Sequence, residues 1–158
     1  SDALYNGTRF RVLNIIDEGV REALDIVIDT SLPAARVVRT LEQLKAERGL
    51  PKMIRVDNGS EMTSFAFTQW CEEKDITICY IEPGKLNQHV YIERFNRSYR
   101  TEVLDTHLFA SLEQVRELSW AWMVSYNEER PHESLGNLPP SEFKRQLVAD
   151  VSNYELCA

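Results

Sequence analysis

The order in which strands and helices follow one another is the feature that most restricts how this chain folds. Two strand-like runs, 9–17 and 22–29, are rich in β-branched residues and are joined by a turn near Gly19. A short apolar stub before the turn-forming pair Asn6-Gly7 adds the remnant of a first strand. Helical and strand-like segments alternate after these runs, which is typical of a parallel half-sheet. The sequence therefore predicts a mixed α/β sheet whose first three strands are antiparallel.

The spacing of apolar residues locates the later elements. Four segments have helical spacing, and two of them begin with recognisable start signals, Pro33 and Ser111. Helices are expected over 33–48, 64–74, 90–104 and 112–129, and strands over 53–57 and 76–81. These elements are enough for one domain with a sizeable core.

Composition and charge narrow the class of protein. Hydrophobic residues make up 43% of the 158 positions and charged residues 27%, which is ordinary for a globular chain. No apolar run is long enough for a membrane span and the start lacks a leader pattern, so we expect a cytoplasmic protein with no membrane partner. Three cysteines and three histidines lack ligand spacing, which disfavours a zinc site. The net charge of −7 means that any contact with DNA must be local.

Two carboxylates are expected to meet at one edge of the sheet. Asp57 ends a predicted central strand, and Glu93 lies in the first turn of the helix after the next strand, with 35 residues between them. Open α/β sheets place their sites at the carboxyl ends of strands. Carboxylate oxygens select Mg²⁺ or Mn²⁺, and two such ions promote phosphoryl transfer. The competing interpretation is a turn residue at Asp57 and a solvated helix charge at Glu93.

Three segments of the chain resemble a known family. They read "VDNGSEM", "PGKLNQHVYIERFNRSYRTEVL" and "YNEERPHESLGNLPPSEF". They are similar to the catalytic core shared by retroviral integrases and transposases of the bacterial insertion-sequence-three family. The family's D-N-G motif matches Asp57, and its Y-I-E-R-F-N motif matches Glu93. The resemblance implies a ribonuclease H-like fold and a DDE polynucleotidyl transferase that holds two Mg²⁺ or Mn²⁺ ions, cleaves DNA and joins the freed 3′ hydroxyl to a target.

The resemblance also implies a third acidic residue on the first strand. In similar transposases this aspartate lies upstream of the position that corresponds to Ser1, and Asp2 and Asp17 are the alternatives within this sequence. We therefore expect a catalytic core over residues 1–146, truncated at its N-terminus, followed by a tail over 147–158. Such a fragment is expected to be inactive alone, with two of the three carboxylates.

The loop before Glu93 departs from the family pattern. Leu86, His89 and Val90 stand where relatives usually have a proline, an asparagine and a small residue. These positions are expected to border the substrate. The sequence leaves open whether this altered loop is compatible with activity.

A local basic patch is the expected contact with DNA. Lys85 and Asn87 on the loop, with Arg94 and Arg97 on the following helix, are placed to contact phosphates. The competing interpretation pairs Arg97 with Glu93 along the helix. The expected partners are the element ends, the target DNA and further copies of the chain, at least as a dimer.

Two rival functions are weighed against the transferase. A phosphorelay receiver domain also uses acidic residues at strand ends, and Asp17, Glu18 and Asp57 fit superficially, but 22–29 reads as a strand where that fold needs a helix. A non-catalytic assembly module of a degenerate transposase is the stronger rival. Trp120, which lies off the apolar stripe of its helix, favours it.

Overall fold

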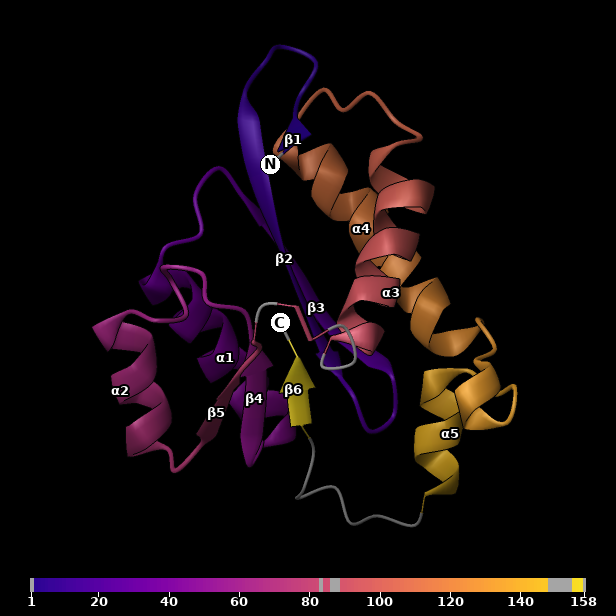
Figure 1. The fold of residues 1–158 in the computed structure, drawn as a ribbon. Coiled ribbons are helices and arrows are strands. Elements are labelled where there is room, and N and C mark those ends of the chain that lie inside the picture. Colours follow the sequence, from indigo (N-terminus) through magenta and orange to yellow (C-terminus); the bar gives the residue numbers. More distant parts are fainter. Residues whose placement is uncertain (1, 83, 86–88, 148–154, 158) are drawn as a thin grey trace.

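A computed structural model describes residues 2–82, 84–85, 89–147 and 155–157 of the chain (Figure 1). The strands of its sheet are β1 (Asp2–Ala3), β2 (Arg9–Asp17), β3 (Glu22–Asp29), β4 (Met53–Val56), β5 (Thr77–Tyr80) and β6 (Glu155–Cys157). Strand β2 pairs with β1, β3 and β6, and β4 pairs with β6 and β5. The β1-β2 and β2-β3 pairs are antiparallel and β4-β5 is parallel, as the sequence predicted. The ribonuclease H-like fold class is therefore confirmed.

Helices cover both faces of the sheet (Figure 1). They are α1 (Ala34–Arg48), α2 (Phe65–Glu73), α3 (Val90–Tyr99), the π-helical turn η2 (Arg100–Leu104), α4 (Leu112–Glu128), the short 3₁₀ helix η3 (Glu133–Leu135) and α5 (Pro140–Gln146). The predicted helix over 90–104 is confirmed in extent, and its last turn widens to a π-helix closed by the hydrogen bond from the Asp105 N–H to the Arg100 carbonyl. None of the described helices has the length and apolar character that crossing a bilayer requires.

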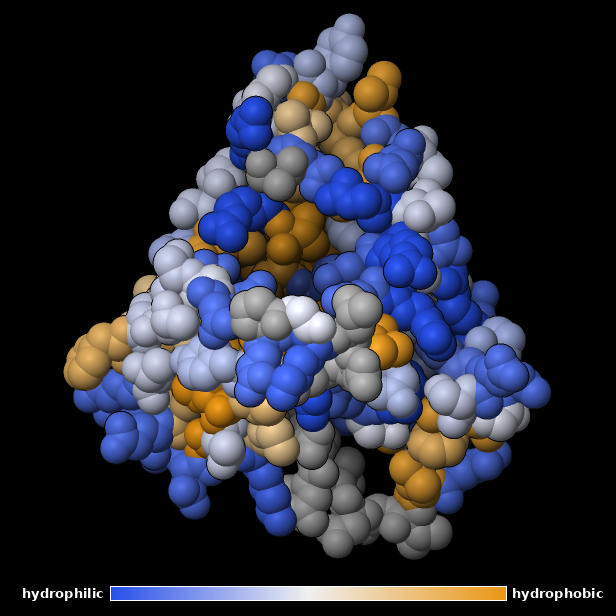
Figure 2. All heavy atoms as spheres, viewed as in Figure 1, coloured by the Kyte–Doolittle hydropathy of each residue, from blue (hydrophilic) through white to orange (hydrophobic). Residues whose placement is uncertain are grey.

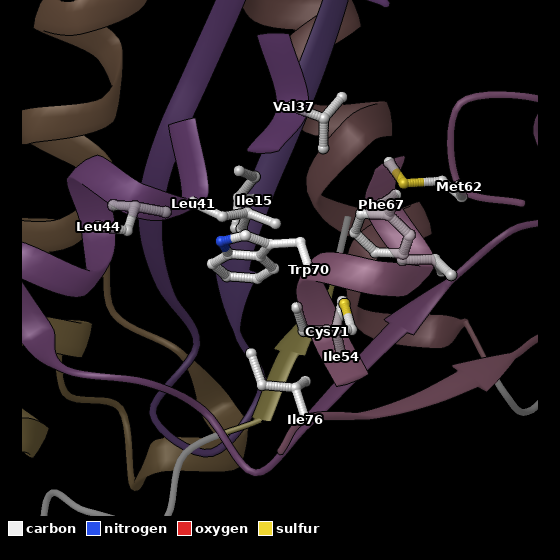
Figure 3. Packing of buried hydrophobic residues seen from close by; sticks show 11 residues of the cluster. Ile15, Val37, Leu41, Leu44, Ile54, Met62, Phe67, Trp70, Cys71 and Ile76 are labelled. Atoms are coloured by element: carbon white, nitrogen blue, oxygen red, sulfur yellow. The ribbon is translucent and has the colours of Figure 1, made fainter. Parts of the chain in front are cut away.

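Alternation along β2 explains why the sheet has two apolar faces. Ile15 points to the face covered by α1 and α2, where it joins Phe67 and Trp70 in one buried cluster (Figure 3). Phe10 and Ile16 point to the other face, toward the clusters that α3 and α4 complete. Successive side chains of a strand face opposite ways, so one strand anchors both layers. This arrangement fixes α3 against the middle of the sheet.

Local signals set the helix ends that matter for the site. Ser64 caps α2 by accepting a hydrogen bond from the Phe67 N–H, and Ser111 caps α4 by accepting one from the Gln114 N–H. The chain leaves α1 at Gly49, which has a positive φ of 79°. These ends agree with the sequence prediction to within one or two residues.

The sheet is interrupted along one edge of β2. There β1 pairs with Arg9 and Phe10, while β6 pairs with Ile16 and Asp17. Residues 11–15 pair with β3 on the opposite edge, but among the described residues no strand pairs with them on this one. The strand β6, which runs parallel to β4, was not predicted from the sequence. The division into a core over 1–146 and a tail over 147–158 stays a prediction.

Candidate active site

Asp57 follows the last residue of β4 and is held by a tight local turn. Its Oδ1 accepts a hydrogen bond of 2.8 Å from the Gly59 N–H, and the Asn58 amide donates to the Ile81 carbonyl at the end of β5, 3.2 Å away. A Cβ atom at Gly59 would lie 2.9 Å from Asp57 Oδ1, closer than real Cβ atoms approach. The Asp-Asn-Gly sequence therefore both orients the carboxylate and ties together the ends of two parallel strands.

Glu93 comes to the same place from the first turn of α3. Its N–H donates to the His89 carbonyl, 3.0 Å away, and its side chain is exposed. Asp57 and Glu93 both line one pocket of about 320 Å³, with the end of β5 and Lys85 on its rim. The structure thus brings together two carboxylates that are far apart in the sequence, as the sequence analysis expected.

His89 stands beside both carboxylates. Burial lowers the pKa of His89 below its ordinary value, the charges of Glu93 and Asp57 act to raise it, and Arg55 lowers it. Its Nε2 is buried and has no hydrogen-bond partner within the described residues. One of the three residues at which the sequence departs from the family pattern therefore lies within electrostatic reach of both acidic groups.

A second, larger pocket lies against the interrupted edge of β2. It has a volume of about 430 Å³ and meets the first pocket at Asp57 and His89. Its other lining residues are Arg11, Val12, Leu13, Asn14, Glu61, Met62, Ile92, Asn96, Tyr99, Arg100 and Leu104. Figure 2 shows a hollow with a hydrophobic floor and a hydrophilic rim over the middle of the molecule, where β2 runs in Figure 1. Asp57 therefore lines both the pocket at the gap in the sheet and the pocket that it shares with Glu93.

The two aspartates considered as alternatives for the first acidic residue lie elsewhere. Asp2 is engaged by Arg100, which donates hydrogen bonds of 3.0 and 3.1 Å to its two carboxylate oxygens. Asp17 is the last residue of β2. Strand β2 runs antiparallel to β6, and β6 runs parallel to β4, so β2 and β4 point in opposite directions. Asp17 therefore lies toward the opposite end of the strands from Asp57. Neither residue lines either of the two pockets.

The donor set at the site suits a hard cation but is incomplete. The two carboxylates offer oxygen ligands, which Mg²⁺ and Mn²⁺ prefer. In the described part of the chain no group of three or more His, Cys, Asp or Glu side chains is arranged to hold a metal ion. The arrangement therefore fits a divalent metal site that needs at least one further ligand.

The predicted DNA-contacting residues fall into three groups. Lys85 lines the pocket with Asp57 and Glu93 and pairs with Glu82 at 2.8 Å. Arg94 and Arg97 are exposed on α3, and within the described residues no ion pair joins Arg97 to Glu93. Asn87 lies outside the described residues, as does Leu86.

Comparisons with known proteins show to which family the chain is similar. A family model described as "Integrase core domain" matches residues 2–86, and a second model with the same description matches residues 74–140. The 39.2 kDa protein of insertion element IS476 from Xanthomonas euvesicatoria is 44% identical over 96% of this chain, and the 31.7 kDa protein of IS407 from Burkholderia multivorans is 42% identical over 95%. The chain spans 44% and 55% of the length of these relatives.

Solved structures show the same fold at low sequence identity. The catalytic core domain of HTLV-2 integrase, in a trimeric form with magnesium, has a TM-score of 0.65 at 15% identity, and the match covers 90% of each chain. The catalytic core domain of BIV integrase has a TM-score of 0.61 at 18% identity and covers 84% of this chain and 90% of its own. At such identities the likeness establishes the architecture.

Proposed function

The chain belongs to the integrase core domain family, and from this premise we propose that it is the core of an insertion-element transposase, a DDE polynucleotidyl transferase that cleaves DNA and joins the 3′ end to a target. The observation that carries the proposal is the convergence of Asp57 and Glu93 on one open pocket. Both carboxylates are exposed and offer oxygen ligands to one pocket, so they are placed to share divalent cations, which promote phosphodiester chemistry.

The residues of the site have separate proposed roles. Asp57 and Glu93 would hold Mg²⁺ or Mn²⁺, two ions in a complete site, and such ions stabilise the attacking and leaving oxygens of an in-line displacement. The Gly59 N–H keeps Asp57 oriented through its 2.8 Å hydrogen bond. Lys85, on the rim of the pocket, is placed to contact a phosphate beside the reacting one. His89, whose pKa is lowered chiefly by burial, lines the same pocket as the two carboxylates.

The third carboxylate is proposed to come from a residue upstream of Ser1. The strand β1 pairs with β2 at Arg9 and Phe10, so an upstream continuation of β1 would run along residues 11–15 of β2. That stretch borders the larger pocket, which Asp57 also lines. A carboxylate carried by such a strand would lie beside the pocket that Asp57 lines.

The test is metal-dependent cleavage of element-end DNA by a chain extended upstream of Ser1 with its own coding sequence. We expect Mn²⁺-dependent nicking by the extended chain and none by residues 1–158 alone. Glu93→Gln should lower the rate at least about 100-fold, equivalent to ~2.7 kcal/mol. Glu72→Gln is the matched control, because this exposed carboxylate of α2 lines neither pocket and should leave the rate unchanged. Full activity of Glu93→Gln would refute the proposed role, and activity of residues 1–158 alone would refute the upstream ligand.

A second candidate function is a non-catalytic assembly module. Two large apolar side chains of α4 are exposed, Trp120 at 64% and Val124 at 41%. Apolar surface of this kind is typical of interfaces between copies of a chain. Sedimentation should therefore show a dimer whether the chain is a transferase or an assembly module. Assembly is the whole function only if carboxylate variants of the extended chain have the same DNA-cleavage activity as the parent.

A further inference from the structure

Arg21 and Arg94 both lie beside Tyr91, on the flank of α3 that faces away from the paired carboxylates. Arg21, in the turn between β2 and β3, places its guanidinium 3.4 Å from the centroid of the Tyr91 ring, and Tyr91 belongs to the first turn of α3. Arg94 lies three residues after Tyr91 and is therefore its neighbour on the helix surface. Figure 1 shows the turn between β2 and β3 beside the start of α3. Arg94 follows Glu93 directly, and consecutive helix residues face different ways.

The same two arginines act electrostatically on an aromatic pair, the buried Tyr126 and the half-buried His132. The rings of Tyr126 and His132 are in edge contact, with centroids 4.9 Å apart. Arg130 stands over the Tyr126 ring, 5.4 Å from its centroid. Burial raises the pKa of Tyr126 to about 12, against the lowering effect of Arg130, Arg21 and Arg94. Arg130 thus lies over an aromatic floor formed by Tyr126 and His132, and Arg21 and Arg94 lie within electrostatic reach of it.

The same three arginines act on His132. Burial lowers its pKa, and Arg130, Arg21 and Arg94 lower it further, with no carboxylate among the groups that act on it. Its Nε2 is buried without a hydrogen-bond partner in the described part of the chain, and so is Arg21 Nε. Unsatisfied buried polar groups of this kind are rare in folded proteins and call for a ligand or water.

The charge of this cluster is only partly balanced. Glu102 accepts hydrogen bonds from Arg130 at 2.5 and 2.7 Å. Among the described residues neither Arg21 nor Arg94 takes part in an ion pair, although the whole chain has a net charge of −7. Guanidinium groups bind phosphate through paired N–H donors, and an aromatic floor excludes the water that would weaken the contact. The site therefore suits an oxygen-rich anion.

We propose that Arg21, Arg94 and His132 form a second DNA-contacting site, which binds a backbone phosphate across α3 from the carboxylates. This inference rests on the proposed function, because it takes DNA as the substrate. A helix with its side chains is about 10–12 Å across, and the major groove of a duplex is about 12 Å wide. A duplex whose reacting phosphate lies between Asp57 and Glu93 therefore has further phosphates within reach of this flank.

The salt dependence of DNA binding tests the proposal. A fluorescently labelled duplex is titrated with the 158-residue chain between about 50 and 200 mM salt, where the slope of log K against log salt has a magnitude of about 0.9 for each phosphate that the protein neutralises. Arg21→Gln/Arg94→Gln should reduce this magnitude by the equivalent of one to two phosphates. Arg39→Gln, an exposed arginine of α1 on the opposite face, is the matched control and should leave the slope unchanged. Arg94→Gln alone replaces an exposed helix residue and is therefore not expected to disturb folding. It should reduce the salt slope by about half as much as the double variant.

Proton NMR of the His132 ring gives a readout that does not depend on activity. Adding the duplex should raise the pKa of His132 in the parent chain, because a bound phosphate offsets the three arginines, and should not change it in Arg21→Gln/Arg94→Gln. Parent-like salt slopes in both arginine variants, or no binding by the parent chain, would overturn this site. The proposed chemistry fails separately, if Asp57→Asn or Glu93→Gln in the extended chain cleaves DNA at the parent rate.

Discussion

Two aspartates of this chain end a strand in nearly the same local structure, and their surroundings make them different groups. Asp57 accepts a hydrogen bond from the Gly59 N–H at 2.8 Å, and Asp17 accepts one from the Gly19 N–H at 2.9 Å. Asp57 is exposed and lines two pockets, whereas Asp17 is only 5% exposed and lines neither. The turn is the same, but β2 and β4 run in opposite directions. Sheet direction, not the local motif, decides which carboxylate can reach Glu93.

The largest expected effect separates the two aspartates by activity. In the extended chain Asp57→Asn should lower the rate of DNA cleavage at least about 100-fold, or ~2.7 kcal/mol, because a neutral amide holds a divalent ion poorly. Asp17→Asn should keep the parent rate within about twofold, a difference of less than ~0.5 kcal/mol. The measurement is a cleavage time course with Mn²⁺. An equal loss in both variants would show that the comparison is wrong.

The glycines sharpen the comparison at a smaller scale. A Cβ at Gly59 would lie 2.9 Å from Asp57 Oδ1 and 3.2 Å from Glu61 Oε1, while one at Gly19 would lie 3.3 Å from Asp17 Oδ1. Gly59→Ala should therefore displace the Asp57 carboxylate and lower activity about tenfold, or ~1.4 kcal/mol. Gly19→Ala should leave activity at the parent level. Cleavage rates of the two variants, measured side by side, decide the matter.

Burial gives the stability contribution of Asp17 a dependence on pH. Desolvation raises the pKa of Asp17 in the folded state, against its hydrogen bonds and Arg48. A raised carboxyl pKa contributes stability below the unfolded value near 3.8 that is lost as pH rises through the folded pKa. Asp17→Asn should therefore be more stabilising at pH 7 than at pH 3. Urea unfolding at the two pH values measures this, and a smaller gain at pH 7 would contradict it.

The smallest expected effect is metal binding by the isolated chain. With two carboxylates the site should bind Mn²⁺ weakly, and Mn²⁺ at a concentration about equal to its dissociation constant stabilises the fold by ~0.4 kcal/mol. Thermal unfolding with and without Mn²⁺ should show a small rise in Tm for the parent and for Asp17→Asn. Asp57→Asn should show no rise. A rise that survives in Asp57→Asn would place the ion elsewhere.

Much of this arrangement follows from sequence patterns. Apolar alternation in β2 and β3 and helical spacing after Pro33 predict the order of elements, and the Asp-Asn-Gly turn marks the end of β4. These are local signals, so they are readable from one chain. The convergence of Asp57 with Glu93 required the fold class as well, because it depends on which strands are parallel.

Other features depend on contacts that sequence spacing does not encode. The position of β6 between β2 and β4 is a pairing over more than a hundred residues. The contact of Arg21 with Tyr91 joins a turn to a helix about seventy residues later, and no spacing in the sequence indicates it. The π-helical turn after Tyr99 has no signal that we recognise in the sequence.

An anomalous difference map from crystals of the chain soaked in Mn²⁺ tests the central claim most directly. The account predicts a peak about 2.0–2.3 Å from a carboxylate oxygen of Asp57 and from one of Glu93. Crystals of the Asp17→Asn variant, soaked in Mn²⁺ in the same way, should show the same peak. A manganese ion bound at Asp17, or at one of the two pocket carboxylates with the other turned away, would contradict the claim that positions 57 and 93 share a metal.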